Sequence, residues 1–517
     1  MSCIKMVSTR ELILLCSILS VSSTAKILGV FSFCSRSHFV LGFRLMKELA
    51  DKGHEVTFIN SYPQQVPIKN LKDISVEETI KHASAYMANL TKFGEMDHWG
   101  QMEFMLGLGR TYAEVVLKNK NVQNLLNSDE RFDLVIMEHL WNEAFVIFAQ
   151  RFKCPLIYFS PGPTSIFNNH LFSNPSPSSY FPNLLTGYGS RMNFWERLRN
   201  TYLDILSEIF VEFKLIPEQN DLLKAAVSDA PDIRTILYNA SLMFVMSDIS
   251  IHDPLPLQPS IKSIGGHHVG PLKPLASNIQ QFMDNATEGV IIFSMGSNSA
   301  SSTFDLEKRK DILKVFSKIK QKVLWKFETD IIEKSSNIMI TSWLPQQEVM
   351  AHPNTVAFIS HGGLLGTIEA VYFGVPILGI PRFWDQHKNI EDAVRRNMAI
   401  KLNYHNINEQ VFGSALNELL NNPMYRNSAK RQSQIMDDRP VKPLDEAVFW
   451  IEYVIRYRGA PHLRPAALDL KWYQKYLMDI VVFCSFIGIT CLLFVFLAWK
   501  CIYSNRKKIV SFSKKNK

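Results

Sequence analysis

Short β-rich apolar runs that alternate with helical patterns are the feature of this sequence that most restricts its fold. The run "KILGVFSF" (26–33) is followed by a helical pattern over 39–50 and then by "EVTFIN" (55–60). Further along, "FDLVIME" (132–138), a second helix-like segment and "PLIYFS" (155–160) repeat that order. Because strands that are separated by helices usually pair in parallel, these residues predict βαβ units and an α/β fold.

The same alternation starts again in the second half of the chain. Its strand-like runs are "GVIIFSMGS" (289–297), "KVLWKF" (322–327), "IMITSWLP" (338–345), "VAFIS" (356–360) and "VPILGIP" (375–381), with a helical pattern over 305–318. Residues 254–274 between the halves are rich in proline, glycine and histidine, which predicts an inter-domain linker. We expect two Rossmann-like doubly wound domains, 26–268 and 269–440, with ligands bound beyond the carboxyl ends of the strands.

The N-terminal residues have the pattern of a targeting segment. Lys5 and Arg10 precede an apolar run over 12–19, and small residues follow as far as Ala25. This order of a basic region, an apolar region and a cleavage-like end predicts a signal peptide over 1–25.

The C-terminal residues predict a membrane anchor. Residues 480–499 contain no charge and would span about 30 Å as a helix, the thickness of the hydrocarbon core. A helical segment, 441–479, is expected before this transmembrane helix, and a cytoplasmic tail, 500–517, is expected after it. The tail ends in "KKNK", which resembles a dilysine signal for retrieval to the endoplasmic reticulum. The expected topology is therefore single-pass type I, with lumenal domains on the endoplasmic reticulum membrane.

The net charge of +8 reflects this topology. Seven of the positive charges lie in the tail and one lies in the N-terminal segment, so residues 26–499 are neutral overall. A neutral body does not indicate nucleic-acid binding, and the membrane is the expected partner of the basic tail.

The sequence also bears on disulfides, metal sites and glycosylation. Only Cys34 and Cys154 lie in the expected lumenal part, so we expect neither a disulfide scaffold nor a CxxC metal site. The sequence shows no acidic cluster that suggests a metal ion. Asn89, Asn239 and Asn285 begin Asn-X-Ser/Thr triplets and are predicted glycosylation acceptors.

The stretch "FISHGGLLGTIEA" (358–370) predicts a phosphate-binding turn. A buried strand ends at His361, Gly362 and Gly363 form the turn, and a helix follows. Glycines let the backbone approach a ligand closely, and a helix N-terminus offers unpaired N–H groups and partial positive charge. Glu369, two turns along that helix, is placed to accept hydrogen bonds from ribose hydroxyls. A tight turn with an ordinary surface glutamate is the alternative reading of these residues.

Two neighbouring motifs favour the ligand-binding interpretation. "SWLPQ" (342–346) puts an indole, Trp343, at the same sheet edge, where it can stack on a base, and Gln346 can contact the polar edge of that base. "PRFWDQ" follows the next strand, so that Asp385 and Gln386 can hold a polyhydroxyl group.

Residues 343–386 closely resemble the signature of membrane-bound UDP-glycosyltransferases of the UDP-glucuronosyltransferase-like group. "RPVKPLDEAVFWIE" (439–452) also resembles that family, and the likeness covers nearly the whole chain. The resemblance implies the two-domain GT-B fold, with UDP-sugar as co-substrate and no further cofactor. It assigns the UDP-sugar site to Ser297, Trp343, Gln346, His361, Gly362, Gly363, Gly366, Glu369, Asp385 and Gln386.

Within that site, the resemblance gives each part of the donor a partner. Trp343 and Gln346 contact the nucleoside and Glu369 contacts the ribose. Ser297 and His361 contact the diphosphate, and the Asp385–Gln386 pair contacts the sugar. The sequence departs from the family at Leu365, where many members have asparagine. The Leu-Leu pair after the glycines resembles invertebrate members, which tend to use UDP-glucose.

The first half has a histidine where a dinucleotide-binding protein would have its glycines. "CSRSHF" follows the first strand, so the absence of a GxGxxG motif disfavours a dehydrogenase. His38 lies at a strand–helix junction, and the family uses this histidine as the general base. Glu138 occupies the position of the carboxylate that orients the base, where aspartate is usual, and Asp133 is the nearest alternative.

These observations predict an enzyme that transfers a hexose from a UDP-sugar to a hydroxyl of a small lipophilic acceptor. An inverting displacement with UDP-glucose as donor is favoured, in a detoxification-type conjugation. Many Met, Phe and Tyr residues over 61–250 could line an apolar acceptor pocket, although for most of them individually an ordinary core is the favoured interpretation. A UDP-glucuronosyltransferase and a non-catalytic membrane binder of lipophilic ligands are the alternatives, and a homo-oligomeric state is left open.

Overall fold

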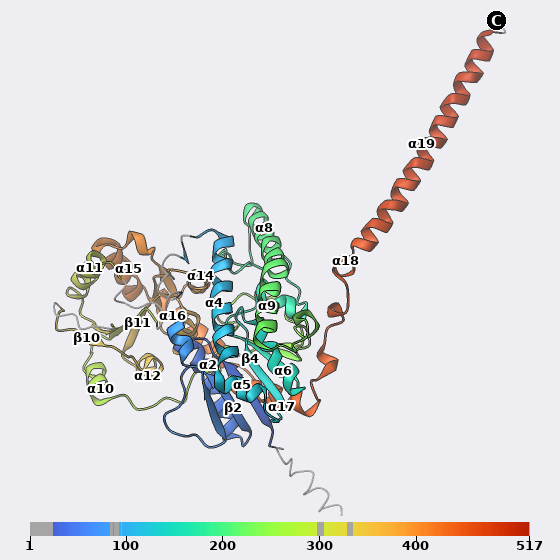
Figure 1. The fold of residues 1–517 in the computed structure, drawn as a ribbon. Helices are drawn as coiled ribbons and strands as arrows, with labels where there is room; N and C mark the ends of the chain where they lie inside the picture. Colours follow the sequence, from blue (N-terminus) through green and yellow to red (C-terminus); the bar gives the residue numbers. More distant parts are fainter. Residues whose placement is uncertain are drawn as a thin grey trace, which may run out of the picture. The chain divides into compact units, whose positions relative to one another are not determined.

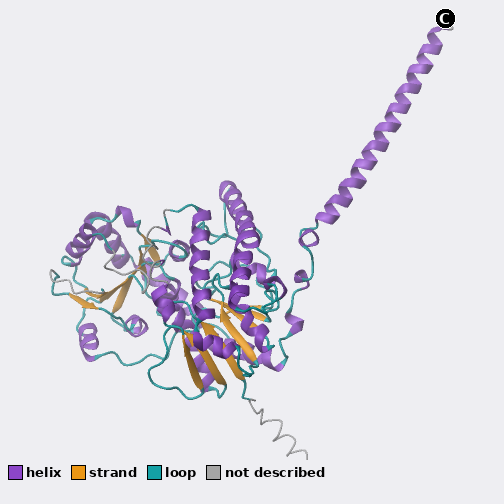
Figure 2. Ribbon diagram, in the orientation of Figure 1, coloured by secondary structure: helices purple, strands orange, loops and turns teal. Residues whose placement is uncertain are grey.

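The first half of the chain forms a seven-stranded parallel sheet (Figures 1 and 2). The computed structural model describes residues 24–515, except 83–85, 87–92, 95, 297–303 and 328–333. The strands are β1 (Lys26–Phe31), β2 (Glu55–Asn60), β3 (Leu71–Ser75), β4 (Leu134–Glu138), β5 (Leu156–Ser160), β6 (Leu242–Val245) and β7 (Ile261–Ser263). Their order across the sheet is β3-β2-β1-β4-β5-β6-β7.

The second half forms a six-stranded parallel sheet of the same kind. Its strands are β8 (Val290–Ser294), β9 (Lys322–Lys326), β10 (Ile338–Thr341), β11 (Thr355–Ser360), β12 (Ile377–Gly379) and β13 (Ala399–Lys401). Their order is β10-β9-β8-β11-β12-β13, so the predicted α/β class with two Rossmann-like sheets is confirmed.

Helices cover both sheets. In the first half these are α2 (Arg36–Asp51), α4 (His98–Lys118), α5 (Lys120–Leu126), α6 (Ile147–Phe152), α7 (Ile166–Asn169), α8 (Phe194–Phe210) and α9 (Ile216–Ala226). In the second half they are α10 (Ser277–Asp284), α11 (Leu306–Phe316), α12 (Gln346–Ala351), α13 (Leu364–Tyr372), α14 (Gln386–Arg395), α15 (Glu409–Asn421), α16 (Pro423–Asp437) and α17 (Pro443–Arg456).

Each sheet has a point where the order of its strands reverses, and these two points position the site. In the first sheet β1 and β4 are neighbours, although more than 100 residues separate Val30 from its partner Met137. In the second sheet β8 and β11 are neighbours, and Ser294 pairs with Ser360. The loops that leave adjacent strands at such a point diverge to opposite faces, which opens a crevice for a ligand.

One apolar core joins the two halves. It contains Phe39 and Leu45 of α2 together with Ile368 of α13 and Ile451 of α17, all of them buried. Helix α17 follows the second sheet in sequence but packs against α2 of the first half. The two halves therefore share buried apolar surface and are not independent domains joined only by a linker.

The structure corrects the predicted linker. Strand β7 (Ile261–Ser263) lies inside residues 254–274 and pairs with β6 at the edge of the first sheet. Strands β3, β6 and β13 were also absent from the sequence prediction. The helix-like segment expected between "FDLVIME" and "PLIYFS" begins as a 3₁₀ turn, η1 (Glu143–Val146), before α6.

Residues 464–517 form a separate unit. It contains the 3₁₀ turn η8 (Ala466–Leu468), α18 (Trp472–Lys475) and α19 (Met478–Lys515). Within α19, the segment Met478–Arg506 is the one helix in the described part of the chain that is long and apolar enough to cross a membrane. The predicted span, 480–499, falls inside it.

Helix α8 carries an exposed apolar face. The large apolar side chains exposed along α8 and the π-helical turn after it are Phe194, Trp195, Leu198, Tyr202, Ile205, Ile209 and Phe213. Trp195 is 73% exposed and Phe213 is 75% exposed. The opposite side of the helix is buried and carries the polar Asn200, Asp204 and Ser207 beside Leu203 and Phe210, so the outer face of α8 is the more apolar one.

Candidate active site

A cavity of about 660 Å³ lies where the carboxyl edges of the two sheets face each other. The first half contributes residues that follow β1, β4 and β5, and the second half contributes residues that follow β8, β10, β11 and β12. Of the predicted site residues, those that line it are His38, Trp343, Gln346, His361, Gly363, Gly366, Glu369, Asp385 and Gln386.

A histidine and a carboxylate meet on the first-half wall. His38 lies in the first turn of α2, and its Nδ1 is 2.6 Å from Oε1 of Glu138. Glu138 is the last residue of β4 and is only 1% exposed. The neighbouring positions of β1 and β4 thus bring together two residues that are 100 positions apart. The pair fixes Nδ1, which makes Nε2 the nitrogen of His38 that can act on a ligand.

The His-Gly-Gly turn on the second-half wall needs its glycines. A Cβ at Gly296 would lie 2.5 Å from Cε1 of His361, and a Cβ at Gly363 would lie 2.6 Å from Nε2 of the same ring. Gly362 has φ +82° and would place a Cβ 2.4 Å from Ile390. Side chains at these positions would collide, so the imidazole is held between two stretches of bare backbone.

The ring of His361 is neutral at physiological pH. Burial, assisted by the positive charge of Lys326, lowers the pKa of His361 to about 4. Lys326, the last residue of β9, donates from Nζ to the carbonyl oxygen of Gly296 over 2.7 Å and also lines the cavity. The turn before α13 therefore presents a neutral imidazole and a nearby ammonium group to a ligand.

Three polar side chains form a network beside this turn. Nε2 of Gln346 donates to Oε2 of Glu369 over 2.6 Å, and Nε2 of Gln347 donates to Oε1 over 3.0 Å. Glu369 is 6% exposed, so it is not the ordinary surface glutamate of the alternative reading. Sequence reasoning had separate roles for Gln346 and Glu369, and the structure joins them directly.

Trp343 is open to a ligand. Its side chain is 53% exposed, and the guanidinium carbon of Arg36 lies 5.0 Å from the ring centroid. This cation–π contact connects the start of α2 with the end of β10, across the cavity.

Asp385 is the N-cap of α14 and Gln386 is its first residue, and both line the cavity. Oε1 of Gln386 accepts hydrogen bonds from the backbone N–H groups of Arg382 and Phe383, at 2.9 and 3.3 Å. Asn389 donates to Oδ2 of Asp385 over 2.8 Å. Burial raises the pKa of Asp385 to about 6, against the opposing effects of Asn389 and of His38. Asp385 and His38 therefore come close enough to interact, although they belong to different halves.

The remaining predicted residues fall into three groups. Ser297 and Asn89 lie outside the described residues, as does most of the predicted signal peptide. Asn239 and Asn285 are exposed and accessible to modification. Leu365, the departure from the family pattern, lines the cavity with its apolar side chain.

Sequence reasoning missed several residues that line this cavity. Arg36, Lys273 and Lys326 supply its cations, and His139 with Glu143 adds a second histidine–carboxylate pair. The sequence could have identified Lys326 and His139 as site residues by their position, since each lies at the carboxyl end of a strand inside its sheet. Among the described residues, no group of three or more His, Cys, Asp or Glu side chains could hold a metal ion.

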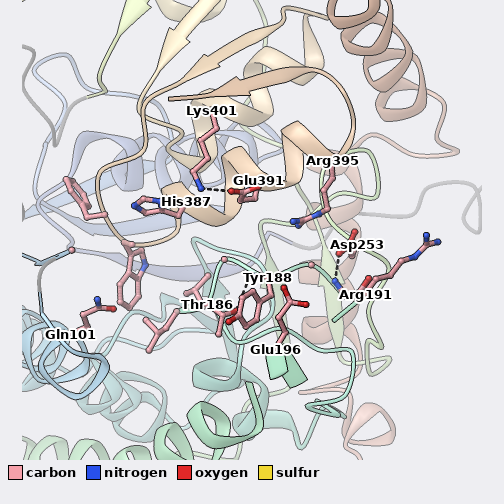
Figure 3. Close-up of a pocket in the computed structure, with 18 of the residues that line it drawn as sticks. Gln101, Thr186, Tyr188, Arg191, Glu196, Asp253, His387, Glu391, Arg395 and Lys401 are labelled. Carbon is pink, nitrogen blue, oxygen red and sulfur yellow. Dashed lines mark hydrogen bonds and ion pairs between the residues drawn. The ribbon is translucent and has the colours of Figure 1, made fainter. Parts of the chain in front are cut away.

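A second cavity, of about 1120 Å³, adjoins the first (Figure 3). Both cavities contact Phe93, Leu184, Phe383 and Trp384. Its charged side chains pair mostly with one another, as Lys401 does with Glu391 (Figure 3). Ser190 donates its backbone N–H to Asp253 over 2.8 Å on the same wall.

The chain matches a family model and many characterised proteins. The model described as "UDP-glucoronosyl and UDP-glucosyl transferase" matches residues 22–516. UDP-glucosyltransferase 2 of Dactylopius coccus is 37% identical over 473 residues, which are 90% of this chain and 91% of that protein. UDP-glucuronosyltransferase 2B9 of Macaca fascicularis is 30% identical over 505 residues, with 91% and 93% covered.

Solved structures show the same architecture. The glycosyltransferase VinC in complex with DTDP aligns with a TM-score of 0.58 at 17% identity, over 84% of this chain and all of that one. The forosaminyltransferase SpnP aligns with a TM-score of 0.54 at 15% identity, over 84% and 100%. The expected GT-B fold is thus confirmed.

Proposed function

Because the chain belongs to the UDP-glucuronosyl and UDP-glucosyl transferase family and is a UDP-glycosyltransferase, we propose that it transfers glucose from UDP-glucose to a hydroxyl of a small lipophilic acceptor. The observation that carries this proposal is the contact of 2.6 Å between the buried Glu138 and His38, which lines the same cavity as the His-Gly-Gly turn. A positioned base on one wall and an anion-binding turn on the other are what a displacement at a sugar carbon requires.

In this proposal His38 is the general base. Its Nε2 takes the proton of the acceptor hydroxyl while the acceptor oxygen forms a bond to C1 of the sugar. Glu138 keeps Nδ1 protonated and stabilises the imidazolium that results. The bond between C1 and the diphosphate oxygen breaks on the opposite face, so the configuration at C1 inverts and UDP leaves.

The second half would hold the donor and needs no further cofactor. Trp343 would stack on uracil, with Gln346 at the nucleoside and Glu369 at the ribose hydroxyls. The helix N-terminus of α13, His361 and Lys326 would face the diphosphate, and the unpaired N–H groups there suit an anion. Asp385 and Gln386 would hold the sugar hydroxyls.

The charges near Asp385 support glucose over glucuronate. The carboxylate of glucuronate would need a compensating cation close to Asp385. Lys388 donates to both carboxylate oxygens of Asp392, at 2.7 and 2.6 Å, and the guanidinium carbon of Arg382 lies 4.3 Å from the ring centroid of Tyr404. These two cations already have partners, and the apolar Leu365 adds none.

A comparison of donors tests the proposal. Microsomes that contain the full chain are assayed with a phenol panel and equal concentrations of UDP-glucose or UDP-glucuronate. We expect a higher kcat/KM with UDP-glucose, and Asp385→Ala should abolish transfer while UDP still binds. A preference for UDP-glucuronate would overturn the donor assignment alone. Absence of UDP release with every acceptor would favour the non-catalytic binder.

We also propose that the protein is a single-pass type I protein of the endoplasmic reticulum, with its catalytic domains in the lumen. The apolar segment Met478–Arg506 and the basic residues after it support this orientation. Protease added to intact microsomes should remove only the C-terminal residues. Replacement of Lys514 and Lys515 by serine should let the protein leave the endoplasmic reticulum, and unchanged localisation would exclude the retrieval signal.

A further inference from the structure

A second histidine–carboxylate pair lies on the first-half wall of the cavity and has no part in the proposed transfer step. His139 directly follows Glu138, and Glu143 is the first residue of η1. Nε2 of His139 lies 3.1 Å from Oε1 of Glu143, and the two side chains are 5% and 1% exposed. Both residues line the same cavity as His38.

The other oxygen of this carboxylate is unpaired. Among the described residues, nothing donates a hydrogen bond to Oε2 of Glu143. The nearby hydroxyl of Tyr158 does not serve, because it donates to the carbonyl oxygen of Leu237 over 2.8 Å. A buried carboxylate with one unpaired oxygen is rare and costly, which favours a form of the pair that carries no net charge.

The charge of the pair decides whether Nδ1 of His139 donates or accepts. The pair is neutral overall either as an imidazolium with a carboxylate or as an imidazole with a carboxylic acid. In the first form both ring nitrogens carry hydrogen. In the second form Nε2 accepts from the acid, and the hydrogen lies on Nδ1. Nδ1 of His139 is therefore a donor in both neutral forms, whereas an ionised Glu143 beside a neutral ring would make it an acceptor. Among the described residues, the hydrogen bond of this ring is the one between Nε2 and Glu143.

The surroundings of this donor are apolar. Met105, Leu108, Trp141, Phe167 and Leu215 line the same cavity as His139. One polar group among apolar side chains fixes the orientation of a bound molecule, because burying that group without a partner is unfavourable. Glu138, by contrast, does not line the cavity and bonds His38.

We propose that His139, positioned by Glu143, donates a hydrogen bond from Nδ1 to a carbonyl-type oxygen of the acceptor, remote from the hydroxyl that receives the sugar. This assignment rests on the proposed glycosyl transfer and narrows its acceptors to flat phenols with a second, hydrogen-bond-accepting oxygen. His139 and Glu143 are positioning and specificity residues and take no part in bond formation.

Two bicyclic phenols test the assignment. 7-Hydroxycoumarin carries a carbonyl at the far end from its hydroxyl, and 2-naphthol has a similar size without that oxygen. The full chain in microsomes should show a higher kcat/KM for 7-hydroxycoumarin. His139→Phe should lower that value about tenfold, mainly through KM, as expected for one lost hydrogen bond, and should leave 2-naphthol nearly unchanged. Glu143→Gln should shift the preference in the same direction.

The controls separate recognition from folding. His139→Asn keeps a donor and should retain part of the preference, whereas Met105→Leu alters the apolar wall and should affect both phenols equally. A thermal shift with UDP shows that each variant still binds the donor. Equal losses with both phenols, or an unchanged ratio in His139→Phe and Glu143→Gln, would overturn the assignment. No transfer to either phenol by the unaltered chain would instead count against the proposed function.

Discussion

His38 and Asp385 line the same cavity from opposite halves, and His38 acts to lower the pKa of Asp385. His38 must be neutral to act as a base, whereas Asp385 must be ionised to accept hydrogen bonds from sugar hydroxyls. Burial raises the pKa of Asp385 to about 6, and His38 opposes that shift. In the proposed mechanism, donor binding and proton transfer would therefore be electrostatically coupled at this point.

Removal of the base should affect turnover and leave donor binding intact. We expect His38→Ala to lower kcat by ~10²-fold or more, because a positioned general base is lost. The Kd for UDP, measured by calorimetry, should hardly change, since the proposed UDP contacts lie on the other half. His405→Ala, an exposed histidine in the 3₁₀ turn Tyr404–Asn406, is the matched control. Near-normal turnover of His38→Ala would show that His38 is not the general base.

Asp385 should give the affinity for the donor a characteristic pH dependence. As the pH falls from 7.5 through about 6, the carboxylate becomes protonated, and the KM for UDP-glucose should rise. Asp385→Asn should have a KM that is higher at pH 7.5 and flat down to pH 5. A raised pKa also means that ionised Asp385 destabilises the fold above pH 6, so the variant should gain on the order of 1–2 kcal/mol at pH 7.5. Urea denaturation measures that gain, and a loss of stability would contradict the assignment.

Most of the predicted site residues lie on the cavity wall, although they are a minority of the residues that line it. His38, Trp343, His361, Glu369 and Asp385 all line it, because each follows a strand of a parallel sheet and parallel strands end at one edge. Contacts between side chains could not be predicted from the sequence. The bonds from Gln346 to Glu369 and from His139 to Glu143 depend on loop conformations that no residue pattern specifies.

At the scale of elements, the turn between β11 and α13 is the least tolerant of change. Gly363→Ala would bring a methyl group to 2.6 Å from Nε2 of His361, so the ring or the helix must move. We expect a loss of ~1–3 kcal/mol in the free energy of unfolding and a weaker affinity for UDP. Gly413→Ala in α15, where the nearest atom lies at 3.4 Å, is the control and should be neutral or stabilising. Unchanged UDP affinity in Gly363→Ala would mean that the turn does not contact the donor.

The strands that were not predicted share a physical reason. β3, β7 and β13 lie at sheet edges and are short, and "LKDIS" of β3 contains two charged residues. Edge strands face water on one side, so their sequences carry no strong apolar signal. β6, "LMFV", is buried but too short to distinguish from a helical segment by its pattern.

At the scale of the whole molecule, buried histidines make the fold sensitive to acid. Burial lowers the pKa of His267 to about 3 and that of His252 to about 4. The folded protein keeps these rings neutral, whereas the unfolded chain binds protons below about pH 6.5. Stability is therefore lost as the pH falls from 6.5 towards 4, and each ring should cost about 2 kcal/mol at pH 4.5.

Urea denaturation of the full chain between pH 7 and pH 4.5 measures this loss. His267→Gln should flatten the dependence, because an amide can still bond the carbonyl oxygen of Leu41, which lies 3.1 Å from Nε2. Exposed His405 should have no such effect when replaced. A stability profile that His267→Gln leaves as steep as before would show that other groups cause the acid sensitivity.

The exposed apolar face of α8 has a consequence for handling the protein. Contiguous apolar surface of this extent promotes aggregation when it meets water. Truncation after residue 463 removes the apolar helix α19 but leaves Trp195, Tyr202 and Phe213 exposed. We therefore expect the truncated protein to precipitate or to need detergent during purification. Glutamate at those three positions should keep the truncated protein in the supernatant after ultracentrifugation. Deleting the C-terminal anchor alone is therefore not expected to give a soluble protein.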